Sequence, residues 1–266
     1  MRAERLNLNL IKSRLSEGAA GCTLFYRDAV DSTNEWAKRD ANEGAADRSI
    51  YFAEKQTAGK GRRGRSWQSP VGSSVAMSVL LRLQIPPEDA SMLTLVMGLA
   101  AAEGLKEVSS LETCIKWPND VVVGGKKLCG ILTEMNSRAD YVVIGIGINI
   151  NVPSFPEELK ETATSLYIAG GREIQREAAA AAVISHFFAD YETFVKTRDL
   201  SGLRGAYEAM LANKGRQVRV LDRMAPYCGV AEGINDKGEL LVRREDGSLG
   251  TVFAGEVSVR GIYGYV

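Results

Sequence analysis

Residues 113–135 read TCIKWPNDVVVGGKKLCGILTEM, and this stretch contains three apolar runs close together. The runs cover 113–117, 120–123 and 127–135, and each has the length of a short β-strand. Gly124 and Gly125 separate the last two runs, and a two-residue Gly-Gly turn is typical of a β-hairpin of the primed type. The stretch therefore predicts a hairpin within a β-sheet.

The flanking sequence predicts further strands and several helices. Strands are expected at 49–55, 73–83 and 141–150, and the second is apolar on both faces, as in a central, covered strand. Helical spacing of apolar residues predicts a core helix over 89–108, and helices are also expected over 178–197, over 203–212 and within 1–20. Ser32 as N-cap and Glu35 at N3 form a capping box that opens a helix closed by Gly44.

The pattern changes near residues 213–215. Short β-like runs follow at 217–221, 229–234, 240–243, 251–254 and 257–262, separated by turn signals such as Asp246-Gly247. Such short, closely spaced strands are typical of a small barrel. We therefore expect two domains, at 1–213 and 214–266.

Composition narrows the class of protein. The 266 residues are 45% hydrophobic, enough to bury a full core, and basic and acidic residues number 33 each, so there is no overall positive charge to attract nucleic acid. His186 is the single histidine and the four cysteines match no metal spacing, which argues against a His-based metal site or triad. Because neither a signal peptide nor a long apolar run is present, we expect a soluble, cytoplasmic protein without a membrane partner.

Residues 56–70 read QTAGKGRRGRSWQSP and suggest an anion site. Glycines at 59, 61 and 64 let the backbone approach a ligand, and the cations Lys60, Arg62, Arg63 and Arg65 supply donors. The run nearly fits the P-loop pattern, but Pro70 would break the helix that a P-loop requires. A solvated basic turn and a nucleic-acid patch stay open as alternatives, although Trp67 favours a loop that docks.

Several motifs then occur in a fixed order. They are Ser32-Thr33-Asn34, the loop at 56–67, Lys116-Trp117-Pro118-Asn119-Asp120, Lys127-Leu128-Cys129-Gly130 and Gly145-Ile146-Gly147-Ile148-Asn149. From about residue 25 onward, the chain resembles the biotin protein ligase family in these motifs and their spacing. The resemblance implies an α+β fold: a class II aminoacyl-tRNA synthetase-like mixed β-sheet with helices packed on one side, followed by a small Src-homology-3-like β-barrel.

The family resemblance also implies a chemistry. Such enzymes join the biotin carboxylate to the α-phosphate of ATP, release pyrophosphate, and pass biotin to a lysine of a biotin carboxyl carrier protein. Both reactants of the first step are anions, so a cation-rich site is the expected catalyst. The carboxylate is already ionised at pH 7, so no general base is needed, which suits a chain with one histidine. The implied substrates are biotin and ATP, with Mg²⁺, and the implied partner is the carrier domain of a biotin-dependent carboxylase.

The resemblance assigns roles to individual residues. Lys127 and Arg62 are the expected catalytic cations. The expected biotin-binding residues are Ser32, Thr33, Asn34, Gln56, Gly59, Lys60, Gly61, Arg62, Lys127 and Gly130. The expected ATP-binding residues are Arg62, Arg65, Lys116, Asn119, Asp120, Lys127 and Asn149, and Asp120 is the candidate ligand for Mg²⁺. Lys60 stands where the family often has arginine, which leaves open how tightly the adenylate is retained.

Other interpretations of these residues stay open. Ser32 and Glu35 are consistent with a helix cap alone, Lys116 and Lys127 with solvated strand residues, and Asp120 with the start of a turn. A lipoate-type ligase would share the fold, and a biotin-responsive DNA-binding protein is a non-enzyme alternative. Because no helix-turn-helix pattern precedes the core, we expect no DNA binding and no repressor activity. A free sheet edge would allow a homodimer.

Overall fold

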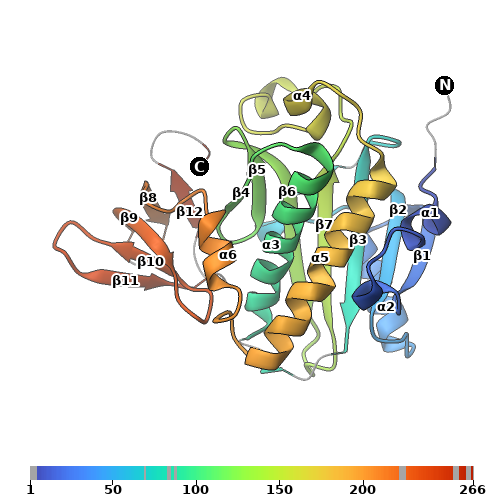
Figure 1. Ribbon diagram of the computed structural model, residues 1–266, viewed down its shortest axis with the longest axis horizontal. Coiled ribbons are helices and arrows are strands. Elements are labelled where there is room, and N and C mark those ends of the chain that lie inside the picture. Colours follow the sequence, from blue (N-terminus) through green and yellow to red (C-terminus); the bar gives the residue numbers. More distant parts are fainter. Residues whose placement is uncertain are drawn as a thin grey trace.

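A computed structural model describes residues 5–68, 70–82, 85–86, 89–221, 226–253, 258–261 and 265. Figure 1 shows a central β-sheet, two long helices across one of its faces, and a smaller β-domain beside it. The helices are α1 (Leu8–Lys12), α2 (Thr33–Asn42), α3 (Ala90–Ser109), α4 (Leu166–Gly170), α5 (Arg176–Thr197) and α6 (Arg204–Ala209). Short 3₁₀ turns cover Glu17–Ala19, Arg62–Gly64 and Glu157–Leu159.

The main sheet has seven strands in the order β1-β2-β3-β7-β6-β5-β4. β1 pairs with β2 in parallel and the other neighbours pair antiparallel, so the sheet is mixed, as predicted. Gly124 and Gly125, with φ of 57° and 76°, form the predicted hairpin turn between β5 and β6. The strands are β1 (Thr23–Val30), β2 (Ser49–Gln56), β3 (Ser74–Leu81), β4 (Thr113–Lys116), β5 (Asp120–Val123), β6 (Lys126–Met135) and β7 (Val142–Asn149).

The long helices α3 and α5 pack against each other on one face of the sheet (Figure 1). Their contact is close because small residues line it: a Cβ on Gly104 would lie 2.8 Å from the backbone nitrogen of Val183. Alternating strand residues such as Ile144 and Ile148 point into the same apolar core. This core fixes the sheet, whose other face carries the candidate site.

The short helix α2 covers part of the opposite face. Trp36 of α2 packs edge-on against Tyr51 of β2, with ring centroids 4.9 Å apart, in a second, smaller apolar cluster. The predicted capping box does not form. Ser32 is the N-cap of α2, but its side chain makes no capping hydrogen bond to the helix. Glu35 instead pairs with Lys38 at 3.0 Å and Lys60 at 2.7 Å, because ionised donors form stronger hydrogen bonds with a carboxylate than a backbone N–H does.

Most expected elements of the fold are confirmed, and one strand was missed. β1 was not predicted, because its residues TLFYRDAV place two charges inside an apolar run. The helix expected within 1–20 covers Leu8–Lys12, and residues 1–4 lie outside the described residues. The strand expected at 73–83 spans Ser74–Leu81, and residue 83 also lies outside them.

The C-terminal region forms a separate antiparallel sheet with the order β11-β10-β9-β8-β12, in line with the predicted small β-domain. Its strands are β8 (Gln217–Leu221), β9 (Tyr227–Ile234), β10 (Leu240–Arg243), β11 (Leu249–Val252) and β12 (Ser258–Gly261). The runs expected at 251–254 and 257–262 extend into residues 254, 257 and 262, which are outside the described part of the chain.

Trp117 joins the two sheets. Its side chain is 1% exposed, and its Nε1–H donates to the Gly238 carbonyl at 2.9 Å. Its backbone N–H donates to Asn213 Oδ1, also at 2.9 Å. The residues directly after Trp117 are therefore held at the border of the C-terminal sheet. None of the helices in the described ranges has the length and apolar character needed to cross a membrane.

Candidate functional site

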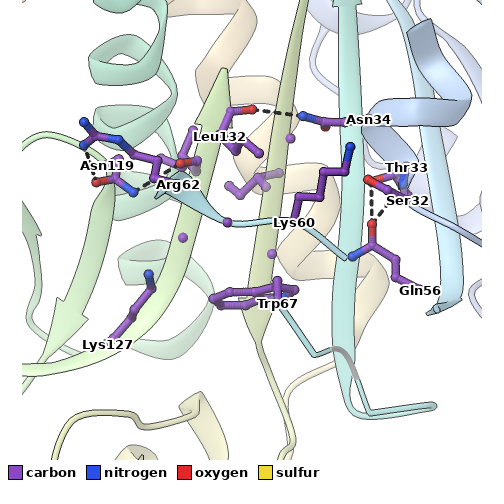
Figure 2. Close-up of a pocket in the computed structure, with 16 residues that line it drawn as sticks. Ser32, Thr33, Asn34, Gln56, Lys60, Arg62, Trp67, Asn119, Lys127 and Leu132 are labelled. Atoms are coloured by element: carbon purple, nitrogen blue, oxygen red, sulfur yellow. Dashed lines mark hydrogen bonds between the residues drawn. The ribbon is translucent and has the colours of Figure 1, made fainter. Parts of the chain in front are cut away.

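Two adjoining pockets lie on the face of the main sheet opposite α3 and α5. The first, here called the polar pocket, is bounded by the start of α2, the loop after β2, and strands β6 and β7 (Figure 2). Its lining residues are Ser32, Thr33, Asn34, Gln56, Lys60, Gly61, Arg62, Trp67, Asn119, Lys127, Gly130, Ile131, Leu132, Gly145, Ile146 and Gly147. Sequence segments more than a hundred residues apart therefore meet in one site.

Two glycines of β7 make room for the polar pocket. Their neighbours Ile144 and Ile148 point into the core, so Gly145 and Gly147 face the other way. A Cβ on Gly145 would lie 2.1 Å from Asn34 Oδ1, and one on Gly147 would lie 2.2 Å from Trp67 Cε2. Side chains at either position would therefore displace Asn34 or the indole ring.

The first residues of α2 form a buried hydrogen-bond network. Ser78 Oγ donates to Asn34 Oδ1 at 2.6 Å and lies 2.8 Å from Thr33 Oγ1. Gln56 Oε1 accepts from the backbone N–H of Thr33 at 2.9 Å, and Asn34 Nδ2 donates to the Leu132 carbonyl at 3.2 Å. Because these partners fix the side chains, the pocket presents preset hydrogen-bonding groups to a ligand.

The glycine-rich loop folds into a tight arch over the sheet. Gly61 N–H donates to the Arg65 carbonyl at 2.7 Å, and Trp67 N–H donates to the Gly59 carbonyl at 2.9 Å. Gly59 is required at the base of the arch, because a Cβ there would lie 2.3 Å from the Trp67 carbonyl oxygen. Arg63 has a φ of 58°, in the left-handed region, at the turn of the arch.

The arch places Arg62 beside the end of β4 and the start of β5. Its Nη1 donates to Asn119 Oδ1 at 3.0 Å. Burial, followed by the charge of Arg63, lowers the pKa of Arg62, while Asp120 opposes the shift. A bound anion would relieve this accumulation of positive charge, which supports the anion site predicted for the loop.

The second pocket is an open groove of about 650 Å³ on the outer side of the arch, here called the basic groove. Its lining includes Arg62, Arg63, Arg65, Lys116, Asn119, Asp120, Lys127 and Tyr265. Lys127 Nζ lies 2.7 Å from Asp120 Oδ1, and Asn119 Nδ2 donates to the same oxygen at 3.1 Å. Pockets of this size accept nucleotide-sized ligands.

The two pockets meet at a shared set of residues. Arg62, Asn119 and Lys127 line both of them, together with Gly61 and Trp67. In Figure 2 these cations and Asn119 lie at one end of the polar pocket, and Ser32, Thr33 and Gln56 lie at the other. Ligands in the two pockets would therefore touch beside Lys127 and Arg62.

Most residues expected at the site lie in one of the two pockets. Gly59 supports the arch without lining a pocket. Asn149 is buried at the end of β7, its amide donates to the Thr164 carbonyl at 3.1 Å, and it lines neither pocket. Its contact with adenosine stays a prediction.

The described residues contain no group of three or more His, Cys, Asp or Glu side chains placed to hold a metal ion. Asp120 is the carboxylate of the basic groove nearest the cations, and its two oxygens contact Lys127 Nζ and the Tyr265 hydroxyl. One carboxylate fits a Mg²⁺ ion that is carried in by phosphate groups, since Mg²⁺ usually binds with few protein ligands.

Three features of the site were not assigned from the sequence. Trp67 lines both pockets, and its position directly after the cationic loop was the available signal. Gly145 and Gly147 have a signal in their alternation with isoleucine along β7. Tyr265 has none, because its place in the basic groove depends on how the C-terminal sheet docks.

Comparison with known proteins gives the same picture. Residues 26–151 match the model of the biotin/lipoate A/B protein ligase family, and residues 215–260 match that of the biotin protein ligase C-terminal domain. The chain is 37% identical over 248 residues to the bifunctional ligase/repressor of Bacillus subtilis, covering 91% of this chain and 76% of that protein. It is 34% identical over 216 residues to the biotin–[acetyl-CoA-carboxylase] ligase of Mycobacterium tuberculosis, covering 79% of each.

A solved structure of a biotin protein ligase has a similar fold. The biotin protein ligase from Aquifex aeolicus, in complex with biotin and ATP, superposes with a TM-score of 0.80 at 31% identity, covering 90% of this chain and 99% of that one. The sequence matches, the shared fold and the two joined pockets all point the same way. The chain therefore belongs to the biotin protein ligase family and is an ATP-dependent biotin ligase.

Proposed function

We propose that biotin binds in the polar pocket, that ATP binds in the basic groove, and that biotinyl-5′-adenylate forms where the two meet. One observation carries the proposal: Arg62 and Lys127 line both pockets, so ligands placed side by side would react next to two cations. The Aquifex aeolicus relative, in complex with biotin and ATP, supports the choice of ligands.

In the first step a biotin carboxylate oxygen attacks the α-phosphorus of ATP. A new O–P bond forms, the bond from the α-phosphorus to the bridging oxygen breaks, and pyrophosphate leaves with that electron pair. No proton moves, because the carboxylate is already ionised at neutral pH. The residues therefore need to position two anions and offset their repulsion, without a general base.

Lys127 and Arg62 supply that compensation. Two unit charges 4 Å apart interact by about 4 kcal/mol at an effective dielectric constant near 20, so each cation offsets a substantial part of the repulsion. Asp120 holds Lys127 Nζ at 2.7 Å, and Asn119 holds Arg62 at 3.0 Å. Both cations are thus oriented before the substrates arrive, which favours catalysis by a preorganised site.

The second step uses the neutral amine of an acceptor lysine. The amine nitrogen attacks the acyl carbon of the adenylate, a C–N bond forms, the C–O bond to phosphate breaks, AMP leaves with that electron pair, and the proton lost by the amine passes to water. The same two cations stabilise the departing phosphate. The arch at residues 59–67 would cover the anhydride until an acceptor arrives, which limits hydrolysis.

The polar pocket suits the ureido ring of biotin, which offers one carbonyl acceptor and two N–H donors. Ser32, Thr33 and Asn34 are each 3% exposed and lie with Gln56 around one end of the pocket. Hydroxyl and amide groups can match both kinds of ligand group. We assign these four residues to the ureido ring and Gly130 to the pocket wall.

The basic groove would hold the nucleotide through Arg65, Lys116 and Asn119. Asp120 would hold Mg²⁺ together with the phosphates, and the ion would screen phosphate charge when bound. Asn149 stays assigned to adenosine by family resemblance, although it lines neither pocket.

We further propose that the acceptor is the biotin carboxyl carrier domain of a carboxylase, as the name of the Mycobacterium tuberculosis relative suggests. Pairing through the β1 edge of the main sheet would allow a homodimer. The Bacillus subtilis relative is also named a repressor, but the balanced charge of this chain argues against DNA binding. A sequence-specific mobility shift with biotin and ATP at physiological salt would contradict that expectation.

ATP–pyrophosphate exchange tests the main proposal. The exchange is measured with biotin, with lipoate and with neither, since the matching family model also includes lipoate ligases. We expect exchange with biotin alone. Exchange that depends only on lipoate would overturn the assignment of the polar pocket to biotin.

A further inference from the structure

Tyr265 reaches the basic groove from the far end of the chain. It follows β12 of the C-terminal sheet, and its side chain lines the groove together with Lys116, Asp120 and Arg65. The contact joins residues 145 positions apart, so it forms only when the C-terminal sheet is docked on the main sheet.

The Tyr265 hydroxyl binds the carboxylate that orients Lys127. It donates to Asp120 Oδ2 at 2.5 Å, whereas Asp120 Oδ1 receives Lys127 Nζ at 2.7 Å. The two oxygens of one carboxylate are thus held from opposite domains. Since Asp120 is 9% exposed, water competes little for either bond.

The ring of Tyr265 also contacts a second candidate nucleotide residue. Lys116 Nζ lies 3.3 Å from the centre of the ring, within the range of a cation–π interaction. Lys116 is 7% exposed, so an aromatic face is a useful partner for its charge. Hydroxyl and ring therefore act on two different residues of the same groove.

We propose that Tyr265 is a positioning residue of the nucleotide site, which fixes Asp120 through its hydroxyl and Lys116 through its ring. This inference rests on the proposed placement of ATP in the basic groove. By this means the C-terminal sheet takes part in the adenylation site, and the groove has its full set of contacts only when that sheet is docked. Because Tyr265 lines the basic groove and not the polar pocket, its loss should affect ATP more than biotin, which it reaches only through Asp120 and Lys127.

Two substitutions separate the parts of this role. Tyr265→Phe removes the bond to Asp120 and keeps the ring beside Lys116, so we expect about a fivefold rise in the KM for ATP. Tyr265→Leu removes both contacts, and we expect a rise of about thirtyfold. In both variants the KM for biotin should rise clearly less than the KM for ATP, and the melting temperature should fall by no more than a few degrees, because few contacts are lost. Tyr167→Phe is the matched control, since Tyr167 lies on α4 and lines neither pocket.

A double-mutant cycle tests the route through Asp120. In an Asp120→Asn background, Tyr265→Phe should change the KM for ATP less than it does in the natural chain. Equal effects in both backgrounds would mean that the hydroxyl does not act through Asp120. An unchanged KM for ATP in Tyr265→Leu, or equal rises for ATP and biotin, would overturn the positioning role.

Direct binding of ATP, measured by calorimetry on the same variants, separates this inference from the proposed function. If the natural chain binds ATP but shows no biotin-dependent exchange, the proposed reaction fails while weaker ATP binding by Tyr265→Leu still supports the inference. If exchange is normal and ATP binding is identical in all variants, the inference fails and the reaction stands. If the natural chain binds no ATP, both are overturned.

Discussion

The two faces of strand β7 have different roles. On one face Ile144 and Ile148 are fully buried against the core that α3 and α5 cover. On the other face Gly145 and Gly147 leave space that Asn34 and Trp67 enter. The first face removes apolar surface from water, whereas the second gives up that burial to make a pocket.

Stability and ligand binding can therefore be changed separately within a few residues of β7. Loss of a methyl group on the core face costs packing and leaves the pocket intact. Addition of a methyl group on the pocket face displaces site residues and leaves the core intact. Two neighbouring lysines of β6 differ in a similar way, because Lys127 lines both pockets and Lys126 lines neither.

The largest effect is expected for Lys127→Ala. The variant should lose biotin-dependent exchange by about two orders of magnitude or more, because it removes a cation from the place where two anions meet. Lys126→Ala is the control: Lys126 donates to the Lys160 carbonyl at 2.7 Å and lines neither pocket. Exchange kinetics and melting curves should show normal stability for both and lost activity for Lys127→Ala alone. Near-normal rates would remove Lys127 from the catalytic step.

Gly147→Ala should have the next largest effect. The new Cβ would lie 2.2 Å from Trp67 Cε2, so the indole must move, and overpacking of this kind costs about 1–3 kcal/mol. If the cost falls on the biotin complex, the KM for biotin rises by about tenfold or more. Gly98→Ala on α3 is the control, since its Cβ would lie 3.8 Å from both Ile115 and Ile131, an ordinary contact. Unchanged biotin binding by Gly147→Ala would show that the pocket tolerates a methyl group there.

Ile144→Val tests the other face with a smaller change. The loss of one buried methylene should lower the free energy of unfolding by about 1 kcal/mol, as measured by urea denaturation. Activity per folded molecule should stay within a factor of about two, because Ile144 lines neither pocket. A marked rise in the KM for biotin would mean that the two faces are coupled.

The sequence predicted the elements whose patterns are local. The hairpin of β5 and β6 followed from Gly124-Gly125, and the long helices followed from apolar spacing. β1 was missed because Arg27 and Asp28 interrupt its apolar pattern, although pairing with β2 stabilises it as a strand. The capping box failed because Lys60 comes from a distant loop to bind Glu35. Local patterns cannot reveal such contacts.

The site followed the same rule. The motifs found in the sequence supply most residues of both pockets, because the strands, the start of α2 and the loop after β2 that carry them lie on one face of the sheet. Asn149 belongs to a recognised motif, but its amide donates to the Thr164 carbonyl and it lines neither pocket, so its contact with adenosine stays a prediction. Tyr265 could not be predicted, since it reaches Asp120 only through the docking of two sheets.

The smallest expected effect concerns a cluster of titratable side chains on the helices α3 and α5. The cluster consists of Glu103, Glu107, His186 and Asp190. Hydrogen bonds to Glu103, and then to Glu107, raise the pKa of His186 to about 9 despite partial burial. Burial, followed by the charge of Glu103, raises the pKa of Asp190 to about 7. Both folded-state pKa values lie above the ordinary ones, so each group stabilises the fold at low pH and loses that contribution as pH rises.

The melting temperature should therefore fall by a few degrees as pH rises from about 5 to 9. Asp190 accounts for the lower part of this range, up to its pKa near 7, and His186 for the upper part, up to its pKa near 9. Asp190→Asn cannot ionise and should flatten the lower part, while His186→Gln should flatten the upper part. Because the cluster lines neither pocket, the KM for biotin at neutral pH should be the same in both variants. A pH profile that both substitutions leave unchanged would place its titrating groups elsewhere, and a changed KM would link the helical layer to the pocket face.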